Sequence, residues 1–209
     1  AGTKSVDGEA PLVVKLVTRD FDMLSLRDAT VTVVSTGDRA QTVSNVTVDL
    51  SHRKGSFTAK GSFGFKTLRF DLEGTLATPQ AADASRPARW PLTFQLKNRL
   101  LQVALDGQVT ATDGVNISGH LDASAPKLRS LARSLGIAVP AAESLKAAKI
   151  SGDIAWAQAR LAMENAKVAI DGNEATGAVM LSLDGDRPLV DASLAFQALN
   201  LSPYFATTG

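Results

Sequence analysis

The chain has 209 residues, of which 44% are hydrophobic and only 5% aromatic, and it contains no cysteine. This length and composition suit one elongated β domain with an aliphatic lining. Lysine and arginine number 22 against 21 acidic residues, which argues against a nucleic-acid-binding protein with a concentrated basic surface. Without cysteine, disulfides and thiolate metal sites are excluded.

Apolar and polar residues alternate along most of the chain, which predicts β-strands with one apolar and one polar face. Short turn sequences, such as those at 66–67 and 171–173, predict antiparallel hairpins. The sequence therefore predicts a mainly β fold, a curved antiparallel sheet that forms an elongated groove. The expected strands cover residues 13–18, 23–34, 43–50, 56–65, 68–77, 92–96, 100–111, 115–123, 149–157, 160–170, 174–183 and 189–198.

A short phrase recurs along these strands, with a glycine between two stretches of alternating residues. It favours a hairpin-sized unit that repeats sideways, as in solenoid-like sheets. The alternative is an ordinary sandwich in which the glycines mark bulges. The glycines of this phrase are Gly61, Gly74, Gly107, Gly119 and Gly152.

Two stretches interrupt the alternation. Residues 79–91 are rich in Ala, Pro, Arg and Ser, and we expect them to form a flexible surface loop. Residues 126–135 place apolar side chains at helical spacing, which predicts one short helix, and a second is expected over 141–147. The first helix should be capped by Ser124, carry Pro126 in its first turn and end at Gly136.

Three basic residues, Lys127, Arg129 and Arg133, lie on the side of this helix opposite its leucines. One interpretation is contact with anionic lipid headgroups. The other is a solvated face of a helix that packs on the sheet. We favour the second, because each charge would contribute only about 1 kcal/mol at an anionic surface.

The sequence contains no group of residues typical of an active site. His52 and His120 lie far apart and lack partners at metal-ligand spacing, so we expect surface histidines. Asp184, Asp186 and Asp191 do not follow the ligand order of a calcium loop and instead indicate a hairpin turn. No nucleophile elbow, phosphate-binding loop or dinucleotide-binding motif is present. We therefore expect a protein that is not an enzyme and needs no metal or cofactor.

The candidate site is the aliphatic face of the sheet. A shift of one residue in register exchanges the two faces of a strand, so the sequence leaves open which face lines the groove. The candidate lining residues are Val46, Val48, Leu50, Val103, Leu105, Ile117, Leu121, Val168, Ile170, Val179 and Leu181.

The chain resembles the AsmA-like family of bacterial envelope proteins, most firmly between Leu121 and Tyr204. The resemblance rests on strand patterns rather than on catalytic signatures, and Asn200 stands where an aspartate is usual. The segments that carry it are LDASAPKLRSLARSLG at 121–136, LAMENAKVAIDGNEATGAVMLSL at 161–183, and Arg-Pro-Leu followed by Leu-Asn-Leu-Ser-Pro-Tyr within 187–204.

The resemblance implies kinship with TamB-like and other bridge-like lipid transfer proteins. It implies an aliphatic β-groove that binds and shields phospholipid acyl chains, for lipid transport between inner and outer membrane or for outer-membrane assembly. Phospholipid is the implied ligand, and outer-membrane assembly proteins are further implied partners. It also implies a periplasmic location with an N-terminal inner-membrane anchor, which we expect outside residues 1–209, so that these residues form one domain of a larger protein.

Two non-enzymatic alternatives remain open. In the first, the chain is a scaffold whose apolar face is the core of a closed sandwich. In the second, an exposed edge strand binds an outer-membrane assembly protein by strand addition.

Overall fold

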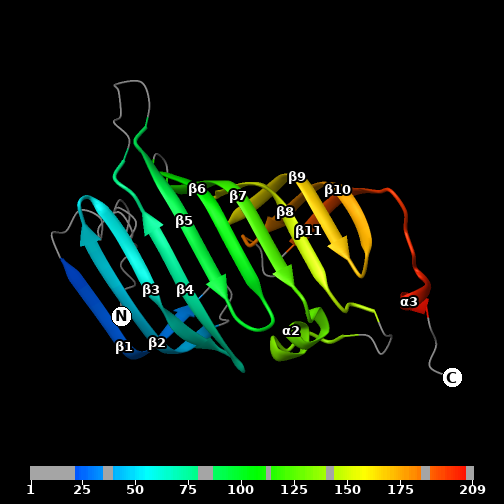
Figure 1. Ribbon diagram of the computed structural model, residues 1–209, viewed down its shortest axis with the longest axis horizontal. Helices are drawn as coiled ribbons and strands as arrows, with labels where there is room; N and C mark the ends of the chain where they lie inside the picture. Colours follow the sequence, from blue (N-terminus) through cyan, green and yellow to red (C-terminus); the bar gives the residue numbers. More distant parts are fainter. Residues whose placement is uncertain are drawn as a thin grey trace, which may run out of the picture.

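The computed structural model describes residues 22–34, 40–79, 87–111, 114–139, 144–184 and 189–205. These residues form one sheet of eleven strands with two short helices (Figure 1). The strand expected at 13–18 and residue Asp186 lie outside the described residues. The elements are β1 (Met23–Val34), β2 (Ala40–Arg53), β3 (Ser56–Phe65), β4 (Leu68–Leu76), β5 (Arg89–Lys97), β6 (Gln102–Ala111), β7 (Val115–Ala125), α2 (Leu128–Ser134), β8 (Ala148–Ala157), β9 (Arg160–Ile170), β10 (Asn173–Ser182), β11 (Leu189–Phe196) and α3 (Ser202–Phe205).

Each strand pairs with its neighbours in the chain, so the spatial order of the strands follows the sequence from β1 to β11. Every pair is antiparallel. The predicted fold, a mainly β, open and curved antiparallel sheet, is therefore confirmed. The sandwich alternative is wrong for the described part of the chain, because all of its strands belong to this single sheet.

The strand register gathers the apolar side chains on one side of the sheet. Leu105 of β6 lies opposite Leu121 of β7 and opposite Phe94 of β5. Residues directly opposite each other in an antiparallel pair share a face. We call this side the apolar face and the other side the polar face. Among the registered positions of the apolar face, Gln41, His52 and Asn173 are polar, and none is an acid, a lysine or an arginine.

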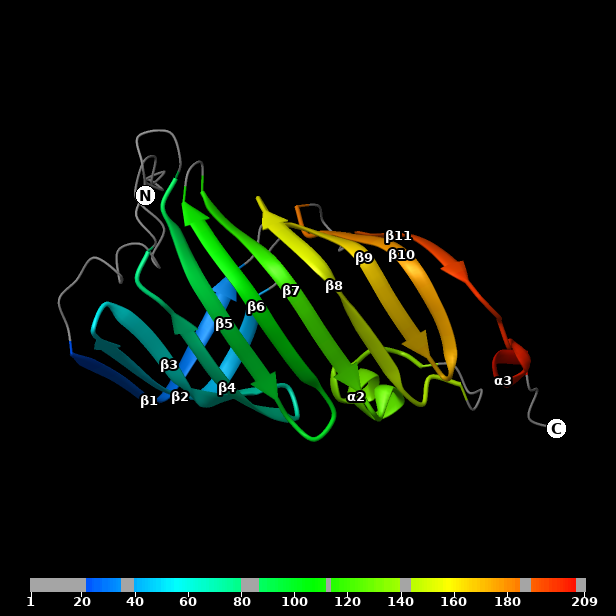
Figure 2. The ribbon, with the colours of Figure 1, turned by 45° about the horizontal axis from the view of Figure 1, so that its top comes forward.

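Irregular pairing bends the sheet at β8 to β10. The register shifts between Ser151 and Asp153 of β8, across from Asn165 with φ 50°, and again between Gly177 and Val179 of β10. Bulges of this kind bend a strand and increase its twist. The end of the sheet that holds β9 to β11 accordingly turns away from the plane of the central strands (Figures 1 and 2).

Two clusters of buried side chains result from this shape. The helix-covered cluster lies beneath α2 on the apolar face, and the bend-covered cluster lies inside the curve of β8 and β9. The helix-covered cluster comprises Leu68, Phe70, Leu100, Ala125 and Leu131, and the bend-covered cluster comprises Ile154, Met163 and Ala166.

Helix α2 confirms the predicted apolar periodicity. Leu131 is buried in the helix-covered cluster, and Leu128 and Leu135 pack against it. As predicted, the helix ends at Gly136, which adopts φ +72°, a left-handed conformation that glycine accepts readily. The predicted cap is wrong, because the helix begins after Lys127, without a side-chain cap, while Ser124 lies inside β7.

The helix predicted over 141–147 is wrong for residues 144–147, which are not helical. Residues 140–143 lie outside the described residues. Leu145 adopts φ 63°. The backbone N–H groups of Leu145, Lys146 and Ala147 donate to the carboxylate of Asp171, at 2.5, 2.6 and 3.1 Å. A carboxylate 24 to 26 residues away thus takes the donors that a helix would have used.

The predicted loop at 79–91 is too long at its C-terminal end. Residues 80–86 lie outside the described residues, but β5 begins at Arg89 and includes Trp90 and Pro91. Pro91 pairs in register with Gln108 of β6, whereas the β4–β5 register ends at Leu92. The carbonyl oxygen of Pro91 still accepts a hydrogen bond from the backbone N–H of Ala77 on the β4 side (2.8 Å). Proline is tolerated here because it lies near the start of β5, at the end of the β4–β5 pairing, where only one donor is lost.

Gly107 and Gly119 explain part of the glycine phrase. They lie opposite each other on β6 and β7, in a stretch without a register shift. A Cβ on either residue would collide with the backbone of the other strand, at Ser118 or Asp106. Glycine is needed here because the two backbones approach closely, whereas Gly152 and Gly177 lie beside bulges.

The C-terminal segment folds back onto the turn between β9 and β10. Asn173 accepts a hydrogen bond from the backbone N–H of Asn200 (2.7 Å) and donates to its carbonyl oxygen (3.1 Å). The hydroxyl of Tyr204, in α3, donates to the same Asp171 carboxylate (3.1 Å). Helix α3 was not predicted from the sequence. The strands expected at 174–183 and 189–198 are confirmed as β10 and β11.

Candidate apolar ligand-binding face

The structure places all eleven candidate lining residues on the apolar face. Leu105 and Leu121 are direct cross-strand partners, and the other candidates share their parity through the register of the sheet. Val46 is buried, and the remaining ten are half-buried. The candidates thus belong to one continuous surface that extends from β2 to β10.

Four of the candidates meet around the bend-covered cluster. Leu105, Leu121, Val168 and Val179 all pack against its buried side chains. The three candidates of β2 lie far along the sheet from this group, because β2 is separated from β6 by three strands. The apolar face is therefore one surface with separate packed regions rather than one compact pocket.

Accessible apolar surface is concentrated at the two edge strands. On β1, Leu24 and Leu26 are 47% and 44% exposed, and on β11, Val190 and Phe196 are 64% and 45% exposed. All four side chains belong to the apolar face. Helix α2 and the bend therefore cover the middle of this face, and its two ends remain open to a ligand.

Alternation also identifies lining residues that the candidate set omitted. Leu26 lies opposite Val48, Leu161 lies opposite Leu181, and Leu194 lies opposite Gly177. Each is an apolar residue of a predicted strand with the same parity as its partner. The missing information was the register between neighbouring strands, since a single strand does not show which residues of the next strand it faces.

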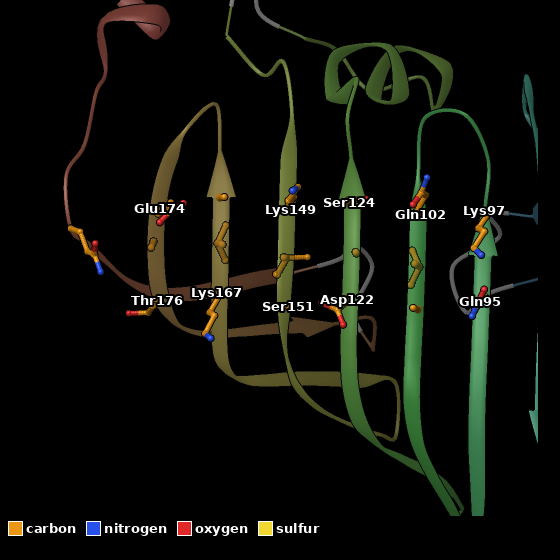
Figure 3. Close-up of a pocket in the computed structure, with 18 residues that line it drawn as sticks. Gln95, Lys97, Gln102, Asp122, Ser124, Lys149, Ser151, Lys167, Glu174 and Thr176 are labelled. Atoms are coloured by element: carbon orange, nitrogen blue, oxygen red, sulfur yellow. The ribbon is translucent and has the colours of Figure 1, made fainter.

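The larger of two described cavities opens mainly on the polar face, which the sequence did not predict. It has a volume of about 730 Å³ and is shown in Figure 3. Its lysines, Lys97, Lys149 and Lys167, come from β5, β8 and β9, and its acids are Asp122 and Glu174. Two candidate residues, Val103 and Val168, also border it.

The charges of this cavity are spread widely. Lys97 and Lys149 are separated by three strand spacings, about 14 Å for neighbouring strands about 4.8 Å apart. A smaller cavity of about 400 Å³ on the same face is bordered by Asp49, Asp71 and Glu73. Charges of both signs at such spacing are typical of a solvated surface.

His120 has partners that its sequence neighbourhood did not reveal. Its Nδ1 lies 3.0 Å from Asp153, and Asn165 donates to the other carboxylate oxygen of Asp153 (3.0 Å). The hydrogen bonds from His120 and then from Asn165 lower the pKa of Asp153. The groups lie on exposed strand positions, so this is a polar surface network, as expected for a surface histidine.

The described residues contain no group of three His, Cys, Asp or Glu side chains that could hold a metal ion. Within the same residues, no helix is both long and apolar enough to cross a membrane.

Comparisons with protein family models, with curated proteins and with solved structures found no match for this chain.

Proposed function

We propose that the apolar face binds and shields phospholipid acyl chains. The observation that supports this most is the continuity of the face. It crosses all eleven strands without an acid, lysine or arginine among the registered pairs. In the described part of the chain it has no second sheet over it. Such a surface gains free energy by covering apolar chains, and it offers no charged group among the registered pairs that would specify a small charged ligand.

The magnitude of the effect suits a mobile ligand. Each methylene group removed from water contributes about 0.8 kcal/mol, so an acyl chain that is only partly covered is still held. Side chains of similar polarity recur from strand to strand, which gives repeated sites of similar affinity. At an open end of the face, a lipid chain can therefore shift between neighbouring strands, because no single deep site holds it.

The open ends of the face are the proposed points of contact. Leu24 and Leu26 at β1, and Val190 and Phe196 at β11, combine apolar character with high exposure. A lipid chain at either end would continue onto half-buried residues such as Val48 or Val179.

The cellular setting is part of the same proposal. We propose an AsmA-like protein of the bacterial envelope that lies in the periplasm, is anchored to the inner membrane and contributes to lipid transport or outer-membrane assembly. Its support is the strand pattern between Leu121 and Tyr204 together with the open curved sheet. Outer-membrane assembly proteins remain proposed partners.

Neighbouring residues on opposite faces give a matched test. The chain is incubated with phospholipid vesicles, the vesicles are removed by flotation, and lipid is extracted from the protein fraction. Val48→Asp and Val168→Asp place a charge on the apolar face and should reduce the recovered lipid strongly. Thr47→Asp and Ala169→Asp place it one residue away, on the polar face, and should leave recovery unchanged.

A shape-conserving pair guards against loss of folding. Val48→Thr and Val168→Thr keep the branched shape and replace one methyl group with a hydroxyl. Circular dichroism should show that both variants are folded, and lipid extraction should show a partial loss of bound lipid. Equal lipid recovery from the apolar-face and polar-face variants would contradict the proposal, as would folded wild-type protein that recovers no lipid.

A further inference from the structure

The outer edge of β11 is a hydrogen-bonding surface without a partner in the described part of the chain. β11 pairs with β10 from Ser182↔Leu189 to Ala175↔Phe196 without a register shift. It is the last strand of the sheet among the described residues, so its other edge presents backbone N–H and C=O groups that no described strand pairs with. A regular, exposed strand edge is a template for another strand.

The opposite edge of the sheet is protected and β11 is not. β1 is interrupted by register shifts on both sides of Ala29, and Asp28 adopts φ 48°. Arg27 on the same strand pairs with Asp49. β11 contains no proline, no bulge, no lysine and no arginine, and its one charged residue is Asp191. Edge strands of natural proteins use proline, bulges and charged side chains to prevent pairing with another strand.

The side chains of β11 are also more exposed than those of the inner strands. Leu189 and Val190 are each 64% exposed, and Phe196 is 45% exposed. At the corresponding positions one strand inward, Leu181 and Ser182 are half-buried and Ala175 is buried. A strand added next to β11 would cover the exposed apolar residues as β11 covers those of β10.

We propose that β11 pairs antiparallel with β11 of a second copy of this chain, with the two-fold axis at Ser193. In that register Val190 lies opposite Phe196 of the second copy, and Ala192 lies opposite Leu194. A two-fold axis perpendicular to the sheet keeps both apolar faces on the same side. The two sheets would then form one continuous apolar surface.

The charges of the polar face favour this register. Asp191 lies opposite the uncharged Ala195 of the second copy, twice by symmetry. A register centred on Asp191 would place the two carboxylates opposite each other, which is destabilising. A slip of one residue would set apolar positions against polar ones. The second copy is therefore a partner whose pattern and charge both match the edge.

The test places charges opposite Asp191. The full chain is studied by sedimentation over a concentration series in buffer without lipid, so the result is independent of the proposed function. Ala195→Asp creates two facing carboxylate pairs and should weaken the dimer about 2- to 30-fold, whereas Ala195→Lys creates two opposite-charge pairs and should strengthen it by a similar factor.

Two further variants separate pairing from general charge effects. Ala178→Asp puts the same charge on β10, opposite Ser193 of its own chain, and should leave the dimer constant unchanged. The double variant Asp191→Ala with Ala195→Asp removes the facing carboxylate and should restore wild-type association. A wild-type chain that stays monomeric at its highest soluble concentration would overturn the proposal, and so would equal effects of Ala195→Asp and Ala195→Lys. Pairing of β11 only with a strand of another protein would overturn it as well.

Discussion

The helix-covered cluster and the bend-covered cluster shield the same face of one sheet by different means. Over β3 to β7, helix α2 inserts Leu131 onto Leu68 and Phe70. Over β8 and β9, no helix is needed, because bulges curve the strands until Met163 and Ala166 cover each other and Ile154. A single-layer sheet can thus bury apolar residues with an added helix or with its own curvature.

A chain of hydrogen bonds connects the two regions. The N–H groups of Leu128 and Arg129, at the start of α2, donate to the carbonyl oxygens of Lys146 and Leu145 (both 2.9 Å). The same two residues donate their own N–H groups to Asp171 in the β9–β10 turn. The position of the covering helix therefore depends on a carboxylate that belongs to the curved region.

The largest expected loss of stability comes from removing a large side chain from the helix-covered cluster. Phe70 is 5% exposed, and Phe70→Ala should lower the free energy of unfolding by about 3–5 kcal/mol, measured by denaturant titration. The control is Leu26→Ala on the exposed end of the same face, where less than about 1 kcal/mol should be lost because the side chain is already partly in water. Equal losses would show that α2 does not create a distinct core.

The close approach of β6 and β7 is tested at Gly107, which lies opposite Gly119. A Cβ at Gly107 would meet the backbone of Ser118 and Gly119, so Gly107→Ala should cost about 1–3 kcal/mol through overpacking. At Gly74, the nearest atoms to an added Cβ lie 3.4 and 3.5 Å away, which is ordinary contact. Gly74→Ala should therefore leave the denaturation midpoint unchanged or raise it. A Gly107→Ala variant as stable as wild type would contradict the close approach of β6 and β7.

The connection between the regions is tested at Asp171. Asp171→Ala removes the acceptor of three backbone N–H groups and of the Tyr204 hydroxyl, and about 1–3 kcal/mol should be lost. Hydrogen exchange at Leu145 to Ala147 should accelerate most. If those amides stay protected, the carboxylate does not hold this segment.

The same carboxylate predicts a dependence on pH. Partial burial raises the pKa of Asp171, but the hydrogen bonds from Ala147, Leu145 and Lys146 outweigh it, so the pKa falls below its usual value of 3.8. A lowered folded-state pKa contributes stability that is present above the unfolded pKa and is lost as pH falls through the folded one. The stability difference between wild type and Asp171→Asn should therefore be full at neutral pH and shrink below about pH 4.

The smallest effect is expected at Tyr204. Tyr204→Phe removes one hydroxyl that donates to Asp171 while keeping the ring, and about 0.5–1.5 kcal/mol should be lost. Thermal unfolding at neutral pH measures this difference. A loss as large as that of Asp171→Ala would mean that α3, rather than the segment at 144–147, is the main partner of the carboxylate.

Local patterns predicted most of the fold, and distant contacts account for what they missed. Alternation located the strands from β1 to β11 because each strand has one face toward the apolar side. The helix expected at 141–147 has helix-forming composition, but Asp171 binds its backbone. Pro91 indicated a loop, yet it lies near the start of β5, at the end of the β4–β5 pairing, where a proline is tolerated.

The position of the candidate residues can be compared with the structure, whereas their role in binding a ligand stays a prediction. Parity alone grouped the eleven lining residues correctly on one face, because none of their strands carries a bulge that exchanges faces between them. Alternation did not reveal that α2 and the bulge at Asn165 cover the middle of this face. It also gave no sign that the larger cavity opens mainly on the polar face, between Lys97 and Glu174. Both features depend on three-dimensional curvature.

Native mass spectrometry of the purified wild-type chain, followed by lipid extraction, tests the central claim most directly. The apolar face should carry phospholipid at a fixed stoichiometry, and the bound mass should disappear in Val48→Asp while Thr47→Asp retains it. A folded wild-type chain that shows only its own mass, after exposure to phospholipid vesicles, would contradict the claim that this face holds acyl chains.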